Sequence, residues 1–135
     1  MLAASVEAHA HHPRARAFVD EVQRPSTLVF CRLTEVACLR LLTQRIAEGF
    51  DPLSNSDSIA VYATWRQDER VRLAEEPPGF VELWPALARR DTASAKLWAD
   101  AYLAAFAIAG AYRLVTFDGG FRQFENRGLD LELLP

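Results

Sequence analysis

The sequence has few cysteines, no long apolar run and no excess of positive charge. Its two cysteines, Cys31 and Cys38, are too few for a disulfide scaffold, and we expect both to be reduced in a cytoplasmic protein. The longest apolar run, residues 101–112, is well short of the ~20 residues that span a bilayer. The formal net charge of −3 does not indicate nucleic-acid binding. Glycine-rich nucleotide-binding patterns are also absent, which argues against chemistry with a nucleotide cofactor.

Lysine is nearly absent as well. Lys96 is the only lysine among 15 basic residues, and the others are arginines. Arginine is the better residue for forked phosphate contacts, but a coding sequence rich in G and C gives the same bias, so this composition carries little weight. With 135 residues, half of them hydrophobic, the chain is long enough to bury a core. We predict a single domain over residues 1–135.

The stretch over residues 98–124 has the clearest local pattern in the sequence. It predicts a helix, a short connection containing Gly110, a strand over residues 113–117 and a turn that opens at Asp118. A helix followed by a strand and an acidic turn is typical of α/β proteins. We therefore predict the α/β class.

Two carboxylates in this stretch are placed unusually. Asp100 shares a helix face with apolar residues, and we expect no lysine or arginine one turn away, since its i+3 and i+4 neighbours are Leu103 and Ala104. A buried carboxylate without a partner costs several kcal/mol, so we expect Asp100 to need a cation from elsewhere. Asp118 follows an apolar strand, where open α/β sheets expose ligand-binding groups. Together the two acids indicate a divalent metal site.

A third acid, Glu35, repeats this placement. A β-branched and aromatic run over residues 27–30 predicts a buried strand, and a helix is predicted over residues 32–48 with Glu35 on its apolar face. Taken alone, Glu35 is explained equally well as a charge that complements the helix dipole. With Asp100 and Asp118 we favour three acids that converge on one edge of a parallel sheet and hold a metal ion.

Three histidines, His9, His11 and His12, precede Pro13. A polar loop and a helix start explain them better than a metal site, because no cysteine or carboxylate is placed to complete a tetrahedral ligand set. The other predicted elements are helices over residues 13–23, 57–67 and 84–90, with Asn55 or Ser56 as the cap of the second, and extended pieces over residues 71–74, 80–83 and 130–134.

Four segments resemble motifs of one family, the PIN-domain ribonucleases, and within it the VapC toxins of bacterial toxin-antitoxin pairs. Residues 99–105, Ala-Asp-Ala-Tyr-Leu-Ala-Ala, resemble the family's third acidic motif, and residues 114–118, Leu-Val-Thr-Phe-Asp, resemble its fourth. Residues 32–36, Arg-Leu-Thr-Glu-Val, resemble the second, and residues 12–18 resemble the first long helix. Each motif is short, but in this order and spacing they are fairly specific together.

The resemblance implies a three-layer PIN-like domain with a short parallel sheet flanked by helices. It implies a Mg²⁺- or Mn²⁺-dependent endoribonuclease that is the toxin of a toxin-antitoxin pair, is silenced by a cognate antitoxin and forms a homodimer. The family's metal-binding and catalytic roles fall on Glu35, Asp100 and Asp118, with Thr116 as a supporting polar residue. The reaction we expect is in-line attack on an RNA phosphodiester by a metal-activated water. The sequence does not rank the arginines that would hold the RNA backbone; the candidates are Arg14, Arg16, Arg32 and Arg122.

One family feature has no counterpart. Family members begin with a central strand that ends in a metal-binding Asp, and residues 1–6 resemble the family segment that comes after this strand. We expect a wrongly assigned start or a truncated chain rather than a natural inactive remnant.

Two other functions remain open from the sequence. A catalytically impaired PIN-like protein would act only as a module that binds the antitoxin or a second copy of itself, without metal affinity. A phosphate-handling enzyme with a strand-end Asp as nucleophile is poorly supported, because the turn after Asp118 is Gly-Gly-Phe and carries no acidic or lysine partner.

Overall fold

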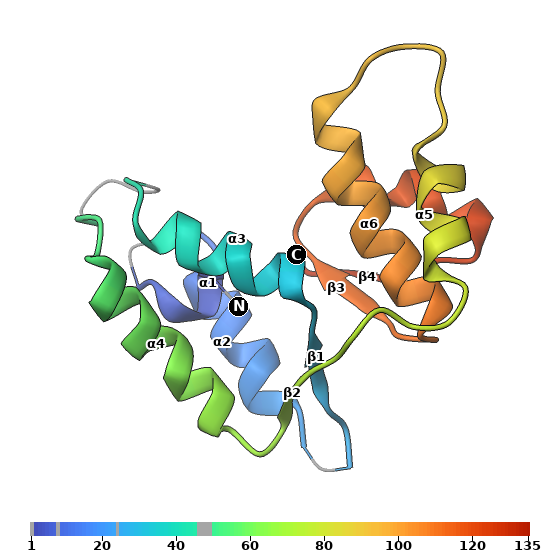
Figure 1. Cartoon of the computed structure of the whole chain (residues 1–135). Coiled ribbons are helices and arrows are strands. Elements are labelled where there is room, and N and C mark those ends of the chain that lie inside the picture. The colour runs from blue at the N-terminus through green and yellow to red at the C-terminus, as the bar shows by residue number, and fades with distance from the viewer. Residues whose placement is uncertain (1, 8, 24, 46–49) are drawn as a thin grey trace. The chain divides into compact units, whose positions relative to one another are not determined.

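The computed structural model describes residues 2–7, 9–23, 25–45 and 50–135. The chain divides into two compact units, Met1–Glu75 and Glu76–Pro135, which are coloured blue to green and yellow to red in Figure 1. Each unit combines helices with one pair of short parallel strands. The protein is therefore mixed α/β with parallel strands, as the sequence predicts. That residues 1–135 form one domain stays a prediction.

The first unit has four helices and two strands in its described part. Strand β1 pairs in parallel with β2, with Leu28 opposite Val71 and Phe30 opposite Leu73. Helix α1 packs on α2, and α3 packs on α4 (Figure 1). The elements are α1 (Leu2–Ser5), α2 (His12–Glu21), β1 (Leu28–Phe30), α3 (Arg32–Leu42), α4 (Asn55–Gln67) and β2 (Val71–Leu73).

Helix α3 supplies the centre of a small core in this unit. Cys38 and Leu42 lie one turn apart on its buried face and pack against Val6. Partly buried hydrophobic residues close the cluster; these are Phe50, Leu53 and Val61. The apolar face predicted from the sequence is therefore the face that α3 buries, and Glu35 shares it.

The second unit is built on α6. Helix α5 packs along α6, and α6 packs against β3, which pairs in parallel with β4 (Figure 1). Leu114 lies opposite Leu131, and Thr116 lies opposite Leu133. The elements are α5 (Phe80–Ala88), α6 (Ala95–Ala109), β3 (Leu114–Thr116), the 3₁₀ helix η1 (Gly119–Arg127) and β4 (Leu131–Leu133).

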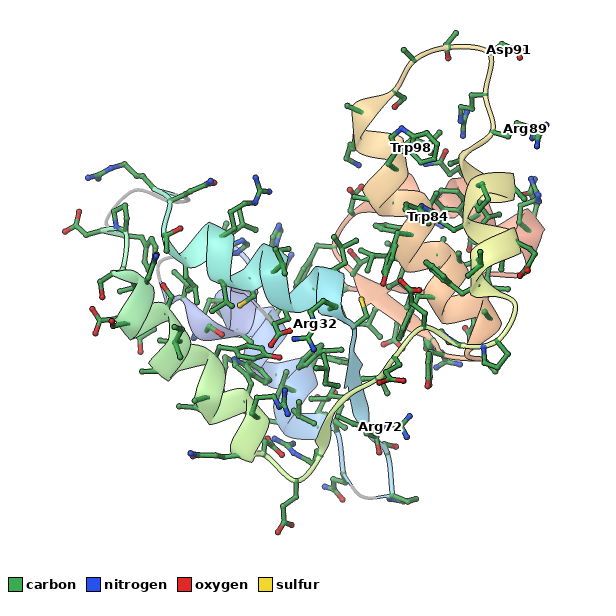
Figure 2. The ribbon with its side chains drawn as sticks, viewed as in Figure 1. Arg32, Arg72, Trp84, Arg89, Asp91 and Trp98 are labelled. Atoms are coloured by element: carbon green, nitrogen blue, oxygen red, sulfur yellow. The ribbon has the colours of Figure 1, made fainter. Side chains whose placement is uncertain are left out.

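Aromatic side chains join α5 to α6. Phe80 contacts Tyr102 edge to face, with ring centroids 4.7 Å apart, and Trp84 contacts Trp98 edge to face at 6.1 Å. Trp84 Nε1 also donates a hydrogen bond to the carbonyl oxygen of Trp98 at 3.0 Å. Figure 2 shows both tryptophans on this helix pair, below the loop that carries Asp91. This packing fixes the N-terminal half of α6, which carries the acid predicted to bind metal.

The predicted extended piece over residues 80–83 is wrong, because these residues form the first turn of α5. β-Branched and aromatic residues favour a strand locally, but Phe80 and Trp84 lie one helical turn apart and their rings stack at 5.8 Å. Gly79 precedes the helix with φ of 84°, a conformation that glycine adopts without strain. Tertiary packing of the aromatic face therefore decides this segment.

Two predicted boundaries also need correction. Helix α3 ends at Leu42 rather than continuing to residue 48; residues 43–45 are not helical, and residues 46–48 lie outside the described part. The Thr43 hydroxyl donates to the Arg40 carbonyl oxygen at 2.7 Å, and the Leu53 N–H donates to the Leu42 carbonyl oxygen at 2.9 Å, so the last turn is satisfied there.

The cap of α4 is Ser54, not Asn55 or Ser56. Its hydroxyl accepts the Asp57 N–H at 3.1 Å, which satisfies one of the first free donors of the helix. Helix α4 therefore starts two residues before the predicted residue 57.

Candidate metal centre

Asp118 lies where β3 ends, as predicted, and it is held by its neighbours. Its Oδ1 accepts the Gly120 N–H at 2.7 Å, which caps η1, and its own N–H donates to Thr116 Oγ1 at 3.1 Å. A side chain at Gly120 would place a Cβ 2.9 Å from Asp118 Oδ1, closer than real Cβ contacts. Gly120 therefore orients the carboxylate of Asp118, and Thr116 holds its backbone. The sequence points to Thr116 as a supporting residue only through the family resemblance. It does not single out Gly120, and the signal that could have found this residue is the Asp-Gly-Gly turn.

Asp100 lies on α6 and shares a cation with Asp118. Its side chain is 14% exposed, which confirms that it sits on the inner side of the helix. Lys96 Nζ donates to Asp100 Oδ2 at 2.8 Å and to Asp118 Oδ2 at 3.0 Å. The expectation that no basic residue lies one turn away is wrong, because Lys96 precedes Asp100 by four residues. On a helix, the residues four positions before and four positions after a side chain both lie next to it, and Lys96 is the residue four positions before Asp100.

Hydrogen bonds and opposite charges stabilise the ionised forms of Asp118 and Lys96. The N–H of Gly120, and then Lys96, lower the pKa of Asp118 from its ordinary 3.8. Hydrogen bonds to Asp100 and then to Asp118 raise the pKa of Lys96 from its ordinary 10.5. Asp118 is therefore a carboxylate and Lys96 an ammonium near neutral pH.

These shifts predict a pH-dependent contribution to stability in the metal-free protein. Because the pKa of Asp118 is lower in the folded state, its charge stabilises the fold above its ordinary pKa of 3.8, and this contribution is lost as the pH falls through the folded value. We expect Asp118→Asn to lower the free energy of unfolding at pH 7, and the difference from the wild type to shrink in acid. Urea unfolding in EDTA over a pH series measures this, and a difference that stays constant into acid would contradict it.

Glu35 lies in the first unit, in the first turn of α3. Its side chain is buried and forms an ion pair with Arg32, labelled in Figure 2. The buried Tyr62 hydroxyl lies near Glu35 and Arg66; burial is the main cause that raises the pKa of Tyr62, and Glu35 adds to it. An ion pair one turn away explains how the helix tolerates this acid. The same ion pair uses the guanidinium of Arg32, which is one of the candidate RNA-binding arginines.

The predicted acids are thus only partly brought together. Asp100 and Asp118 meet in the second unit, whereas Glu35 belongs to the first, and the convergence of all three stays a prediction. Within the described ranges, no group of three or more histidine, cysteine, aspartate or glutamate residues is arranged to hold a metal ion.

The histidine cluster engages the backbone. His12 Nδ1 lies 2.8 Å from the Ala3 carbonyl oxygen, and His9 Nδ1 accepts the N–H of His11 at 3.1 Å. These bonds support the prediction of a polar loop at the start of α2.

The residues present suit a hard divalent cation. Mg²⁺ is commonly bound by one or two carboxylates with waters in its remaining positions, and oxygen-only ligands favour Mg²⁺ or Mn²⁺ over zinc. Asp100 Oδ2 and Asp118 Oδ2 already face a single cationic atom, 2.8 and 3.0 Å from it. The pair is therefore arranged around one cation position.

Comparison with known proteins gives one family. The PIN domain family model matches residues 4–126. Two relatives, from the CDC 1551 / Oshkosh and the ATCC 25618 / H37Rv strains of Mycobacterium tuberculosis, are each named Ribonuclease VapC41. Each is 43% identical over 137 residues, which covers 98% of this chain and 92% of the relative. No helix in the described part of the chain is long and apolar enough to cross a membrane.

Proposed function

This chain belongs to the PIN-domain family, and on that premise we propose that it is a metal-dependent endoribonuclease acting as the toxin of a toxin-antitoxin pair. The observation that carries the proposal is the Asp100–Asp118 pair around a shared cation position. The pair lies in a chain that is 43% identical to a ribonuclease over nearly its whole length. The substrate we propose is RNA, whose phosphodiester bonds it would hydrolyse.

Asp100 and Asp118 would hold Mg²⁺ or Mn²⁺, with Glu35 as a further ligand. When bound, such an ion supplies a water of lowered pKa and neutralises charge on the phosphate. Two neighbours keep Asp118 in place. The Gly120 N–H donates to a carboxylate oxygen of Asp118, and the Thr116 hydroxyl oxygen accepts the Asp118 backbone N–H. The α5 packing holds α6, and with it Asp100, at a fixed position. The protein therefore contributes oriented negative charge, and it needs no histidine as a base.

Partners follow from the family. We propose a cognate antitoxin as the protein partner and a homodimer as the assembly. The RNA backbone would be held by arginines, and Arg14 and Arg122 are exposed candidates. Arg16 is paired with Asp20 at 3.3 Å, and Arg32 is paired with Glu35.

Metal removal tests the proposed function. We expect the purified wild-type protein to cleave RNA in the presence of Mn²⁺ or Mg²⁺, to lose this activity in EDTA and to regain it when excess metal is returned. A gel assay on a mixed pool of tRNA, rRNA and mRNA fragments measures cleavage without presuming the target. Cleavage that persists in EDTA would contradict metal dependence. A folded protein that binds a partner but cleaves no RNA with either ion would instead support the non-catalytic binding module.

A further inference from the structure

Lys96 occupies the cation position of the candidate metal centre. We infer that its ammonium is a built-in competitor for the divalent ion, which fills the space between Asp100 and Asp118 in the metal-free protein and must leave when the ion binds. This inference rests on the proposed function, because it assumes that the two carboxylates are the metal ligands. It assigns a role to the only lysine in the chain.

The competition follows from which oxygens are available. Asp118 Oδ1 already accepts the Gly120 N–H at 2.7 Å, so Oδ2 is the oxygen left to face a cation. That oxygen accepts the Lys96 ammonium at 3.0 Å, and Asp100 Oδ2 accepts it at 2.8 Å. A Mg²⁺ ion needs its oxygen ligands at roughly 2.0–2.1 Å. An ion bound to both oxygens would therefore take the volume that the ammonium fills, and two cations at that spacing repel each other.

Lys96 is able to leave without disturbing the fold. It lies in the first turn of α6, and its side chain is 67% exposed, whereas that of Asp100 is 14% exposed. Lysine carries its charge on a flexible four-carbon stem and hydrates strongly, so water can replace both hydrogen bonds once the ion arrives. The lysine is therefore the mobile partner, and the carboxylates stay where α6 and β3 place them.

The consequence is a lower affinity of the site for the divalent ion. A ligand that must displace an internal competitor binds with an apparent affinity scaled down by the fraction of molecules whose site is unblocked. The same ammonium prevents two facing carboxylates from repelling each other in the metal-free protein. Lys96 thus preserves the shape of the site and lowers its affinity for the ion.

Two measurements on the full chain test this inference. The first is Mn²⁺ affinity by isothermal titration calorimetry for the wild type and Lys96→Gln. We expect Lys96→Gln to bind Mn²⁺ roughly fivefold to thirtyfold more tightly, since two ion-pair contacts no longer need to be broken. The matched control is Arg113→Gln, which removes the same charge and an ion pair to Asp130 at 3.1 Å in the same unit. The control should retain the wild-type affinity.

The second measurement uses the wild type and does not depend on a variant that folds. Because Lys96 is the only lysine, protein made with lysine labelled with ¹³C at Cε gives a single side-chain NMR signal. We expect this signal to move during a Mg²⁺ titration, and to reach its final position when the carboxylates are saturated. In Asp118→Asn, Mg²⁺ should move it less.

The outcomes separate this inference from the proposed function. Equal or weaker Mn²⁺ binding by Lys96→Gln, or a lysine signal that stays fixed while Mg²⁺ saturates the protein, would overturn the inference and leave the metal-dependent ribonuclease standing. Tighter binding in Lys96→Gln without RNA cleavage would support the inference and overturn the proposed activity. If neither ion binds in a manner that depends on Asp100 and Asp118, both fail.

Discussion

We expect Asp118→Asn to cleave RNA on the order of a hundredfold to a thousandfold more slowly than the wild type, and Asp100→Asn to lose a similar factor. Asparagine keeps an oxygen that accepts the Gly120 N–H, so the cap of η1 survives in Asp118→Asn. The substitution removes the negative charge on a ligand of the proposed metal. The loss should therefore appear in the cleavage rate at saturating Mg²⁺ or Mn²⁺, while circular dichroism shows a folded protein.

A matched control distinguishes the loss of a metal ligand from the loss of one negative charge anywhere in the unit. Asp130→Asn removes one carboxylate in the same unit, where Asp130 pairs with Arg113 at the strand pair. It should leave the cleavage rate within about threefold of the wild type, since exposed ion pairs contribute little. Wild-type rates in both Asp100→Asn and Asp118→Asn would refute the proposed site. If Asp130→Asn lost as much of the cleavage rate as Asp100→Asn and Asp118→Asn, the effect would come from the change in charge and not from the loss of a metal ligand.

The largest effect on stability is expected for Phe124→Ala, at about 3–5 kcal/mol in the free energy of unfolding. Phe124 is 2% exposed and lies on η1, with its ring centroid 6.2 Å from that of Phe121. The two residues are three apart, so the 3₁₀ repeat brings both rings to one face. Truncation leaves a cavity under the helix that Asp118 caps. Urea unfolding at pH 7 measures the change.

The control for this prediction is Val81→Ala. Val81 lies on α5 and is 70% exposed, so its loss should change the free energy of unfolding by no more than about 0.5 kcal/mol. A Phe124→Ala protein as stable as Val81→Ala would show that η1 does not depend on this ring. Because η1 begins beside Asp118, we also expect Phe124→Ala to weaken metal binding more than Val81→Ala does.

Much of the fold is set by local pattern. The segments predicted as strands over residues 27–30, 71–74, 113–117 and 130–134 all contain observed strands, because short apolar runs bounded by turn residues are a local signal. The α5 segment is different, since its first residues favour a strand until Phe80, Trp84 and Tyr102 pack together. For the segment of the 3₁₀ helix η1 the sequence predicts only the turn that opens at Asp118, because the repeat of η1 depends on burying Phe121 and Phe124.

The sequence alone was enough to place Asp100 on the inner face of a helix and Asp118 at the end of a strand. Helix periodicity and strand ends are properties of neighbouring residues, so both positions could be read directly. That the two acids share one lysine is a result of tertiary packing. The Lys96–Asp118 contact spans 22 residues and exists because α6 packs against β3, a placement set by the burial of side chains throughout the unit. Contacts of that kind depend on where whole elements lie, which no local pattern specifies.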